Sequence, residues 1–211
     1  MKKISSIALA LCVSAAVFAQ DNTPQLTTPM EKKLRFGVRA GVNLAKFKLS
    51  DFPSGDEPSI QNKTSMHAGL FMNAPLGGMF AIQPGVEYSG QGSKFSEGSD
   101  NGEFDMHYIN VPVMLQWKST GGFFLETGPQ AGILLRANLD DEEVEDETFK
   151  TLDLSWGAGL GYLSRIGLGV NARFNYGLSN ILEGDADDDT SPQLKNQVIQ
   201  VGLVYHFGAG K

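Results

Sequence analysis

The sequence predicts an all-β fold, an eight-stranded antiparallel up-and-down transmembrane β-barrel. Three observations support this prediction: a secretory signal at the start of the chain, eight segments with alternating apolar and polar residues, and connections that are alternately long and short. Alternation with a period of two indicates strands with one apolar face. Short turns at one end and longer loops at the other are typical of membrane barrels.

Residues 1–19 have the three parts of a secretory signal peptide. Two lysines come first, an apolar stretch follows, and the small residue Ala19 precedes Gln20. We therefore expect export from the cytoplasm and a mature chain that begins near Gln20. The only cysteine, Cys12, lies inside this signal, so the mature chain has neither a disulfide nor thiolate chemistry.

The rest of the chain divides into three parts. Residues 20–33 are polar and contain two prolines, which predicts a disordered periplasmic lead-in. Residues 34–207 contain the alternating segments and form the predicted outer-membrane barrel, and residues 208–211 are a C-terminal tail. The mean hydropathy of −0.15 is compatible with a barrel, because a barrel strand meets lipid with only every second residue.

Each of the eight strands has an apolar set of alternate residues, which we assign to the lipid face. This set contains no Lys, Arg, Asp or Glu, as expected from the high cost of charge against acyl chains. In chain order the sets are Phe36, Val38, Ala40, Val42 and Leu44; Met66, Ala68, Leu70, Met72 and Ala74; Phe80, Ile82, Val86 and Tyr88; Ile109, Val111, Val113, Leu115 and Trp117; Phe123, Leu125, Ala131, Ile133 and Leu135; Leu152, Leu154, Trp156, Ala158, Leu160 and Tyr162; Ile166, Leu168, Val170, Ala172, Phe174 and Tyr176; and Ile199, Val201, Leu203, Tyr205 and Phe207.

The connections between these strands are alternately long and short. An even number of strands returns both termini to one side of the membrane, which we expect to be the periplasm. Three prolines, Pro84, Pro112 and Pro129, fall inside predicted strands, where each lacks the N–H group of a ladder bond. We expect β-bulges there. The predicted connections are residues 49–63, 75–78, 96–103, 118–122, 137–150, 164–165 and 179–194.

The polar face of the strands carries charges of both signs. Side chains fill the interior of an eight-stranded barrel, so these charges are expected to form a buried network of ion pairs and hydrogen bonds. The alternative is a selectivity filter that lines a narrow pore. The predicted polar network of the lumen consists of Arg35, Arg39, Glu87, Glu126, Arg136, Asp153 and Arg173.

Glycines recur on the lumen face of two neighbouring strands. Such glycines allow a small, strongly curved barrel to close without crowding. A groove for a lipid tail or small ligand is the alternative. These residues are Gly157, Gly159, Gly161, Gly167 and Gly169.

Two of the long connections are strongly acidic. Clustered carboxylates can hold Ca²⁺ or Mg²⁺, but neither connection has the glycine and terminal glutamate of an EF-hand loop, so we predict a solvated acidic rim and no defined metal site. Divalent cations remain a candidate partner of this rim, and could link it to anionic lipopolysaccharide. The net charge of −7 argues against nucleic-acid binding. The acidic residues concerned include Asp140, Asp141, Glu142, Glu143, Asp187, Asp188 and Asp189.

The sequence contains no pattern typical of an enzyme. His67, His107 and His206 are the only imidazoles. We expect His206 near the periplasmic end, and neither His67 nor His107, expected near the outer end, is grouped with a Ser or an acid. A glycine-rich phosphate loop and a nucleophile elbow are also missing. We therefore predict no catalytic residues and no cofactor. The enzymatic alternative is a lipid-modifying enzyme or a protease of the outer membrane.

Several stretches resemble the PorT-like outer-membrane β-barrel family. They are residues 36–44, 82–88, 108–113, 124–130, 157–161 and 174–178, and the resemblance extends over residues 34–207. It implies a barrel of a Gram-negative outer membrane that contacts outer-membrane lipid and lipopolysaccharide. It also implies insertion by the barrel-assembly machinery, whose aromatic C-terminal signal Tyr205 and Phe207 resemble, although four residues follow them here.

The leading functional prediction is a non-enzymatic structural or interaction protein of the outer membrane. It has a side-chain-filled lumen and acidic loops that face outward. The alternative is a transport role, either as a narrow pore or, as the name of the resembled family implies, as an accessory barrel of a protein-secretion apparatus.

Overall fold

The computed structural model describes residues 33–50, 59–97, 100–139, 142–143, 150–181 and 193–208. No helix in these ranges has the length and apolar character that a membrane crossing needs. The predicted signal peptide, all but the last residue of the predicted lead-in and the end of the tail lie outside the described residues. So do five of the acidic rim residues, Asp140, Asp141, Asp187, Asp188 and Asp189.

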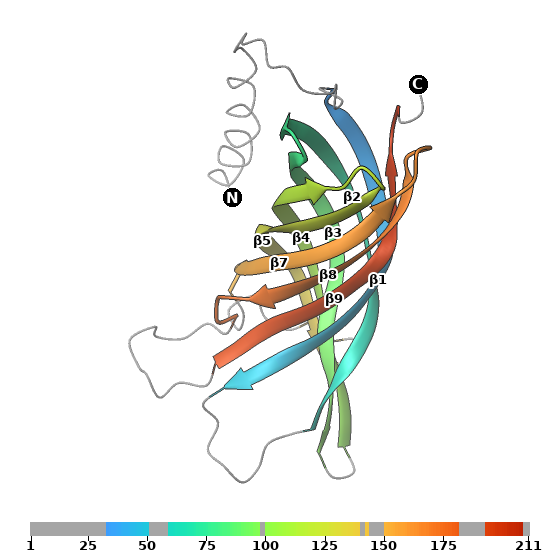
Figure 1. Ribbon diagram of the computed structural model, residues 1–211. Helices are drawn as coiled ribbons and strands as arrows, with labels where there is room; N and C mark the ends of the chain where they lie inside the picture. The colour runs from blue at the N-terminus through green and yellow to red at the C-terminus, as the bar shows by residue number, and fades with distance from the viewer. Residues whose placement is uncertain are drawn as a thin grey trace.

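Eight long strands form a closed antiparallel barrel, which confirms the predicted fold (Figure 1). Each strand pairs with its neighbours in the chain, β4 pairs with β5, and β1 pairs with β9 to close the cylinder. The long strands are β1 (Arg35–Ser50), β2 (Ser59–Gly77), β3 (Phe80–Glu97), β4 (Asp100–Lys118), β5 (Phe123–Leu139), β7 (Leu152–Leu163), β8 (Leu168–Gly177) and β9 (Gln193–His206), and β6 (Glu142–Glu143) is a two-residue strand paired with the end of β5.

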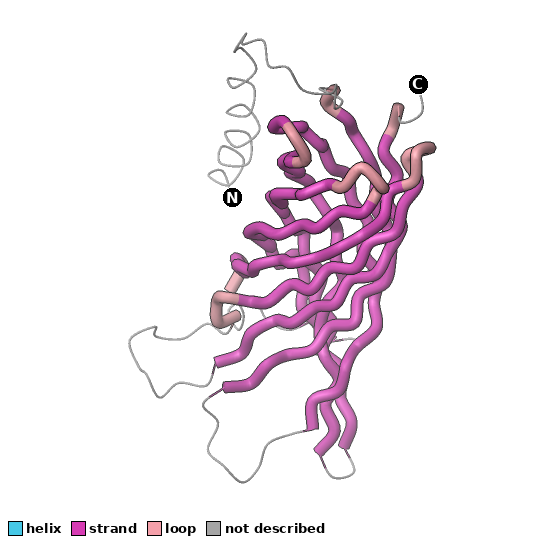
Figure 2. Tube along the Cα trace, in the orientation of Figure 1, coloured by secondary structure: helices cyan, strands magenta, loops and turns pink. Residues whose placement is uncertain are grey.

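The two ends of the barrel differ, as Figure 2 shows. One end, called the turn end, holds the first residues of β1, the last residues of β9 and three tight turns. Gly77, Gly78, Gly122 and Gly167 have φ angles of 118°, 57°, 96° and 88° in these turns, in the left-handed region that favours glycine. The opposite end, called the loop end, holds the last residues of β1 and the first residues of β9.

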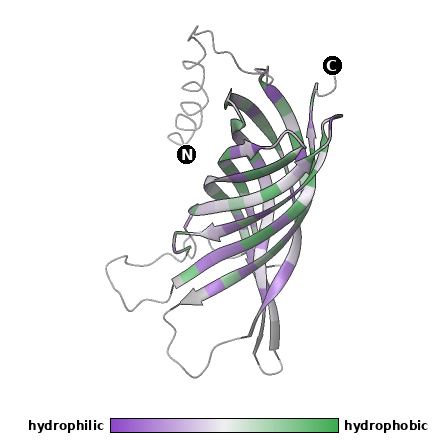
Figure 3. Cartoon of the chain, viewed as in Figure 1, coloured by the Kyte–Doolittle hydropathy of each residue, from purple (hydrophilic) through white to green (hydrophobic). Residues whose placement is uncertain are grey.

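The predicted alternation of faces is present in the eight long strands, except beyond a register shift near the end of β5 (Figure 3). On β2, for example, Leu70 is 67% exposed and the next residue, Phe71, is 5% exposed. The outward residues form a continuous apolar surface around the barrel, called the apolar belt. Aromatic residues are frequent at its turn-end edge, as is typical of the membrane interface: Phe36, Phe80, Trp117, Phe123, Tyr162, Tyr205 and Phe207.

The prediction of bulges at the three prolines is wrong. The pairing register of β3 with β4, β4 with β5 and β5 with β7 is the same on both sides of Pro84, Pro112 and Pro129. A proline lacks a donor but adds no residue, so the strand can lose one ladder bond and keep its register. Register shifts occur instead between Asn62 and His67, between Pro75 and Gly77, and between His107 and Tyr108.

Three neighbouring strands extend beyond the barrel at the loop end. β2, β3 and β4 have 19, 18 and 19 residues, whereas β7 and β8 have 12 and 10. Pairing of β3 with β4 continues to Glu97 and Asp100, so the predicted 96–103 loop is mostly a continuation of this hairpin. We call the projecting part, residues 59–62, 93–97 and 100–103, the ribbon (Figure 1).

A group of ion pairs ties the ribbon to the barrel. The Lys63 ammonium contacts the carboxylates of Glu103, at 2.9 Å, and of Asp105, while the Lys94 ammonium lies 2.9 Å from Glu103. Gly92 has a φ of 130°, and its missing side chain leaves room for the Phe104 carbonyl of β4, with which a Cβ atom at this position would collide. Ion pairs between side chains of β2, β3 and β4 therefore stabilise the ribbon where it leaves the barrel.

Candidate functional site: the barrel lumen

Four charged side chains meet inside the lumen at the level of the middle of the apolar belt. Arg39 of β1, Glu87 of β3, Glu126 of β5 and Arg173 of β8 are all at most 6% exposed. Each occupies an inward position between two outward residues of its strand, and the four strands are distributed around the barrel. We call this group the charge cluster.

The contacts within the charge cluster connect opposite sides of the barrel. Arg173 Nη2 lies 2.6 Å and Arg173 Nε 2.8 Å from Glu126 Oε1. Arg39 lies between the two acids, with Nη2 3.9 Å from Glu126 Oε2 and Nη1 4.0 Å from Glu87 Oε2. Two cations and two anions are therefore buried together, and burial of charges requires such compensation.

A neutral amide donates to one oxygen of each of the two acids. Gln116 Nε2 donates to Glu126 Oε2 at 2.9 Å, and Gln200 Nε2 donates to Glu87 Oε1 at 2.6 Å. Both glutamines are at most 2% exposed. Neither glutamine belongs to the predicted polar network, although both have inward parity on predicted strands, and this parity is the signal that could have identified them.

Polar contacts continue from the charge cluster toward the loop end. His67 Nδ1 lies 2.7 Å from Asn43 Oδ1, and Asn43 Nδ2 donates to the Ser89 hydroxyl at 3.0 Å and to the Gly90 carbonyl at 2.6 Å. Gln200 Nε2, which donates to Glu87, also lies 3.3 Å from Asn43 Oδ1. These polar contacts are therefore connected to the charge cluster.

Toward the turn end the lumen is polar and aromatic. Lys118 Nζ donates to Asn73 Oδ1 at 2.5 Å, and Asn73 Nδ2 donates to Gln116 Oε1 at 2.8 Å. The Phe71 ring packs edge-on against His206 at 4.9 Å, with the Arg39 guanidinium 5.4 Å from the Phe71 ring centroid. This distance is within the range of a cation–π contact.

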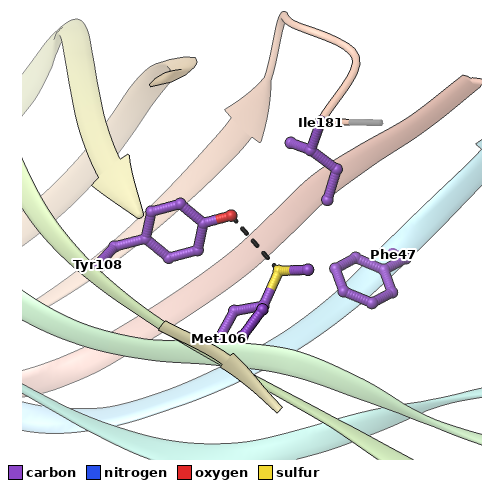
Figure 4. Packing of buried hydrophobic residues seen from close by; sticks show 5 residues of the cluster. Phe47, Met106, Tyr108 and Ile181 are labelled. Carbon is purple, nitrogen blue, oxygen red and sulfur yellow. Dashed lines mark hydrogen bonds between the residues drawn. The ribbon is translucent and has the colours of Figure 1, made fainter. Parts of the chain in front are cut away.

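An apolar cluster of buried side chains lies inside the barrel at the loop end (Figure 4). Phe47, Met106, Tyr108, Ala137 and Ile181 are buried there, and the Tyr108 hydroxyl lies 3.4 Å from the Met106 sulfur. We call this group the apolar plug.

Ile181 reaches the apolar plug from the segment that follows β8. Its N–H donates to the Leu194 carbonyl at 3.0 Å, and its carbonyl accepts from the Lys150 N–H at 2.8 Å. Ile181 has no exposed surface. The residues that directly follow β8, up to Ile181, therefore turn inward at the loop end. The predicted 179–194 connection has no periodic pattern from which this position could be inferred.

The structure brings together only part of the predicted polar network. Arg39, Glu87, Glu126 and Arg173 form the charge cluster. Asp153 is buried in the lumen, but its carboxylate accepts hydrogen bonds from Asn196 and Ser179, each at 2.8 Å, beneath the apolar plug. Asp153, Asn196 and Ser179 therefore form a second polar group, separate from the charge cluster.

The two remaining arginines of the prediction lie elsewhere. Arg35 has inward parity but is only half-buried, at the turn end. The assignment of Arg136 to the lumen is wrong, because its side chain is exposed. The pairing of β4 with β5 shifts by one residue between His107–Arg136 and Tyr108–Leu134, and such a bulge exchanges the two faces of the strand beyond it.

The lumen-face glycines lie against other side chains. A Cβ atom added to Gly157 would lie 2.7 Å from Met114 Cε, and one added to Gly161 would collide with the Phe124 ring. The space above these two glycines is therefore occupied, in agreement with a tightly closed barrel.

Fold and lumen together define a small closed barrel with a lipid-facing apolar belt. The sequence over residues 18–183 matches the family described as outer membrane protein beta-barrel domain, and the chain belongs to this family. None of the curated proteins matches the chain in sequence.

Two solved structures are similar in fold. Neisserial surface protein A from Neisseria has a TM-score of 0.52 and 13% identity, covering 82% of this chain and 97% of that chain. Ail of Yersinia pestis in complex with the heparin analogue sucrose octasulfate has a TM-score of 0.50 and 16% identity, covering 83% and 99%. At these identities the likeness shows the fold alone.

Proposed function

We propose that the protein is a non-enzymatic barrel of a Gram-negative outer membrane with a structural or interaction role and a lumen that does not conduct ions. The observation that carries this proposal is the double closure of the lumen. The charge cluster connects β1, β3, β5 and β8 across the interior, and the apolar plug fills the loop end.

The same proposal includes an orientation. Short turns of outer-membrane barrels face the periplasm and longer loops face outward. The turn end, with the beginning of β1 and the end of β9, is therefore periplasmic, and the loop end, with the ribbon, faces the surroundings of the cell. In this orientation β6, which Glu142 and Glu143 of the acidic rim form, is also external.

The contacts of the histidines support a non-enzymatic role. The His67 ring is bonded to the Asn43 amide, which separates it from the Ser89 hydroxyl. The His107 ring is bonded at 2.7 Å to the Tyr88 hydroxyl on the outer surface. A serine nucleophile needs a direct hydrogen bond to its general base, and neither arrangement provides one.

Planar-bilayer recording tests the closed lumen. The refolded protein should give no steady single-channel steps, with a mock refolding mixture as the control. Steps in the wild type that change their ion selectivity in a Glu87→Gln variant would establish a narrow pore lined by the charge cluster and would refute the closed lumen.

Cysteine labelling on intact cells tests the orientation, because the mature chain has no native cysteine if the signal is cleaved. A cysteine at Lys94 in the ribbon should react with a membrane-impermeant maleimide. The matched cysteine at Gly78, in the β2–β3 turn, should react only after the outer membrane is permeabilised. The opposite pattern would refute the proposed orientation.

The ribbon favours a second candidate role, that of an accessory barrel in a protein-secretion apparatus of the PorT-like type. Within the described residues, positions 59–62 of β2 and 100–103 of β4 pair only with β3. Exposed strand edges of this kind can add a strand from a partner. Deletion of the gene should then reduce protein secretion, and a variant with a shortened ribbon should fail to restore it.

A further inference from the structure

Three lysines lie together on the outer surface of the barrel, just beyond the loop-end edge of the apolar belt. Lys46 and Lys48 occupy outward positions of β1, and Lys195 of β9 lies directly opposite Lys48 in the antiparallel register. Alternate residues share a face and directly opposed residues have adjacent Cβ atoms. The three ammonium groups therefore share one small surface, called the lysine patch.

Uncharged polar and aromatic groups complete this surface. Gln197 of β9 lies between Lys46 of β1 and Tyr176 of β8 in the register. The Lys48 ammonium lies 5.7 Å from the centroid of the Tyr176 ring. Among the described residues, no acid forms a salt bridge with any of the three lysines.

The pairing of Lys48 with Lys195 is unfavourable for the isolated protein. Like charges directly opposite each other destabilise a sheet, and here the strands are regular on both sides of the pair. An anion bound between the ammonium groups would remove this repulsion. The patch therefore has the charge and spacing of an anion site in a chain whose formal net charge is −7.

The position of the lysine patch indicates the kind of anion. The outward residues next to it toward the turn end are Leu44 on β1, Ile199 on β9 and Phe174 on β8, which are 40%, 46% and 42% exposed and belong to the apolar belt. A ligand that satisfies both surfaces has acyl chains along the belt and a phosphate at its edge. Basic residues at this level of a membrane protein recognise anionic lipid headgroups.

We propose that the lysine patch binds the phosphate groups of lipid A, the phosphorylated anchor of lipopolysaccharide, in the outer leaflet. This inference rests on the proposed orientation, because lipid A lies only in the outer leaflet and the patch lies at the loop end. Lys48 and Lys195 contact the phosphate from two strands, and Lys46 and Tyr176 border it.

Native mass spectrometry of the refolded protein in neutral detergent micelles tests the site, with bisphosphoryl lipid A as the probe. The wild type should retain lipid A, and a Lys48→Gln, Lys195→Gln variant should bind it at least about tenfold more weakly. The matched control, Lys33→Gln with Arg165→Gln, makes the same change in charge at the turn end and should bind like the wild type. Equal binding by all three proteins would refute the site.

Two further measurements separate the possible sources of the anion. Lipid A without its phosphates should bind as weakly to the wild type as bisphosphoryl lipid A binds to the patch variant. If phosphatidylglycerol binds the wild type as tightly as lipid A does, the patch is a general anionic-lipid site and the assignment to lipid A is wrong. If the patch binds lipid A but labelling places the loop end in the periplasm, the proposed orientation fails, and lipid A is not its natural ligand.

The stability of the protein gives an independent readout. In lipid-free neutral micelles, Lys195→Gln should raise the unfolding midpoint, because it removes a like-charge pair. In micelles with bisphosphoryl lipid A the same variant should be less stable than the wild type, because it loses the bound phosphate. An effect of the same sign in both conditions would contradict the proposal.

Discussion

Arg173 and Glu126 form the shortest charge contact of the charge cluster, 2.6 Å between Nη2 and Oε1, although they lie on strands β8 and β5 that do not pair with each other. Strand β7 lies between them, and its Gly159 lies opposite Arg173, where an added Cβ atom would be only 3.2 Å from Arg173 Cβ. The ion pair is therefore a connection through the interior, independent of the backbone ladder.

Removal of one partner of this pair should be strongly destabilising. Glu126→Gln keeps the shape of the side chain but leaves the Arg173 charge buried without its main partner, which should cost about 3–5 kcal/mol. Urea unfolding of the refolded protein in micelles measures this change. Arg165→Gln, at an exposed position of the β7–β8 turn, is the control and should change stability by less than about 0.5 kcal/mol. An equally small effect of Glu126→Gln would contradict the buried ion pair.

The register can be tested on β8. Ala172 lies on the lipid face, opposite Val201 of β9 and Leu160 of β7, so Ala172→Arg should destabilise the barrel in bilayers by roughly 2–4 kcal/mol. Thr64→Arg, an outward position at the loop-end edge of the belt, should have a much smaller effect. Equal effects would mean that the apolar belt does not lie in the hydrocarbon layer at Ala172.

Cysteine scanning along the same strand avoids the bulk of arginine. A lipid-soluble quencher should reach fluorophores attached at positions 170, 172 and 174, whose native residues face outward. It should not reach labels at positions 171 and 175, whose native residues are at most 4% exposed. Quenching at 171 and 175 would reverse the register, and uniform quenching would exclude a strand with one lipid face.

Ile181 should be important for closure of the loop end. Ile181→Ala removes a fully buried side chain from the apolar plug and should destabilise the protein by about 2–5 kcal/mol. Amide hydrogen exchange should also accelerate at Ile181 and Lys150, which bond across this segment. Ile166→Ala, at a 67% exposed residue of the β7–β8 turn, is the control. Unchanged exchange at Ile181 would mean that the segment does not hold the mouth closed.

The ion pairs that stabilise the ribbon where it leaves the barrel should weaken at acidic pH. Hydrogen bonds from Lys63 and Lys94 hold the pKa of Glu103, which lies beyond the apolar belt, below its ordinary value of 4.5. A lowered pKa stabilises the folded ribbon above the ordinary value, and this contribution disappears as the pH falls through the folded pKa. Amide NMR signals of the ribbon should shift only at a pH below 4.5, the ordinary pKa of a glutamate. Glu103→Gln should already show the loosened ribbon at neutral pH, and an unaltered acid transition in this variant would assign the effect to another group.

The alternation of the strands could be predicted from the sequence because the apolar and polar sets are separated residue by residue. The charge cluster followed from the same parity, since Arg39, Glu87, Glu126 and Arg173 all precede any bulge that would reverse it. The outward position of Arg136 could not be predicted from this parity. The register shifts by one residue next to Leu134, and no glycine or proline in the sequence marks the shift.

Contacts that depend on loops were not predictable in this way. Ser179 and Ile181 lie outside the strands, where periodicity carries no information. Yet Ser179 donates a hydrogen bond to Asp153, and Ile181 packs in the apolar plug. The ribbon was also missed, because Gly and charged residues in 96–103 suggest a loop, whereas pairing between β3 and β4 continues there.

The seam between β1 and β9 makes barrel formation depend on the entire chain. Its ladder runs from the pair Gly37–His206 to the pair Ser50–Gln193. Strand β1 therefore has only one paired neighbour, β2, until β9 is in place. Contacts between such distant residues make folding slow, and an open strand edge is not tolerated in the hydrocarbon layer. Insertion and closure should therefore occur as one late, concerted event, and a chain that lacks β9 should remain outside the bilayer.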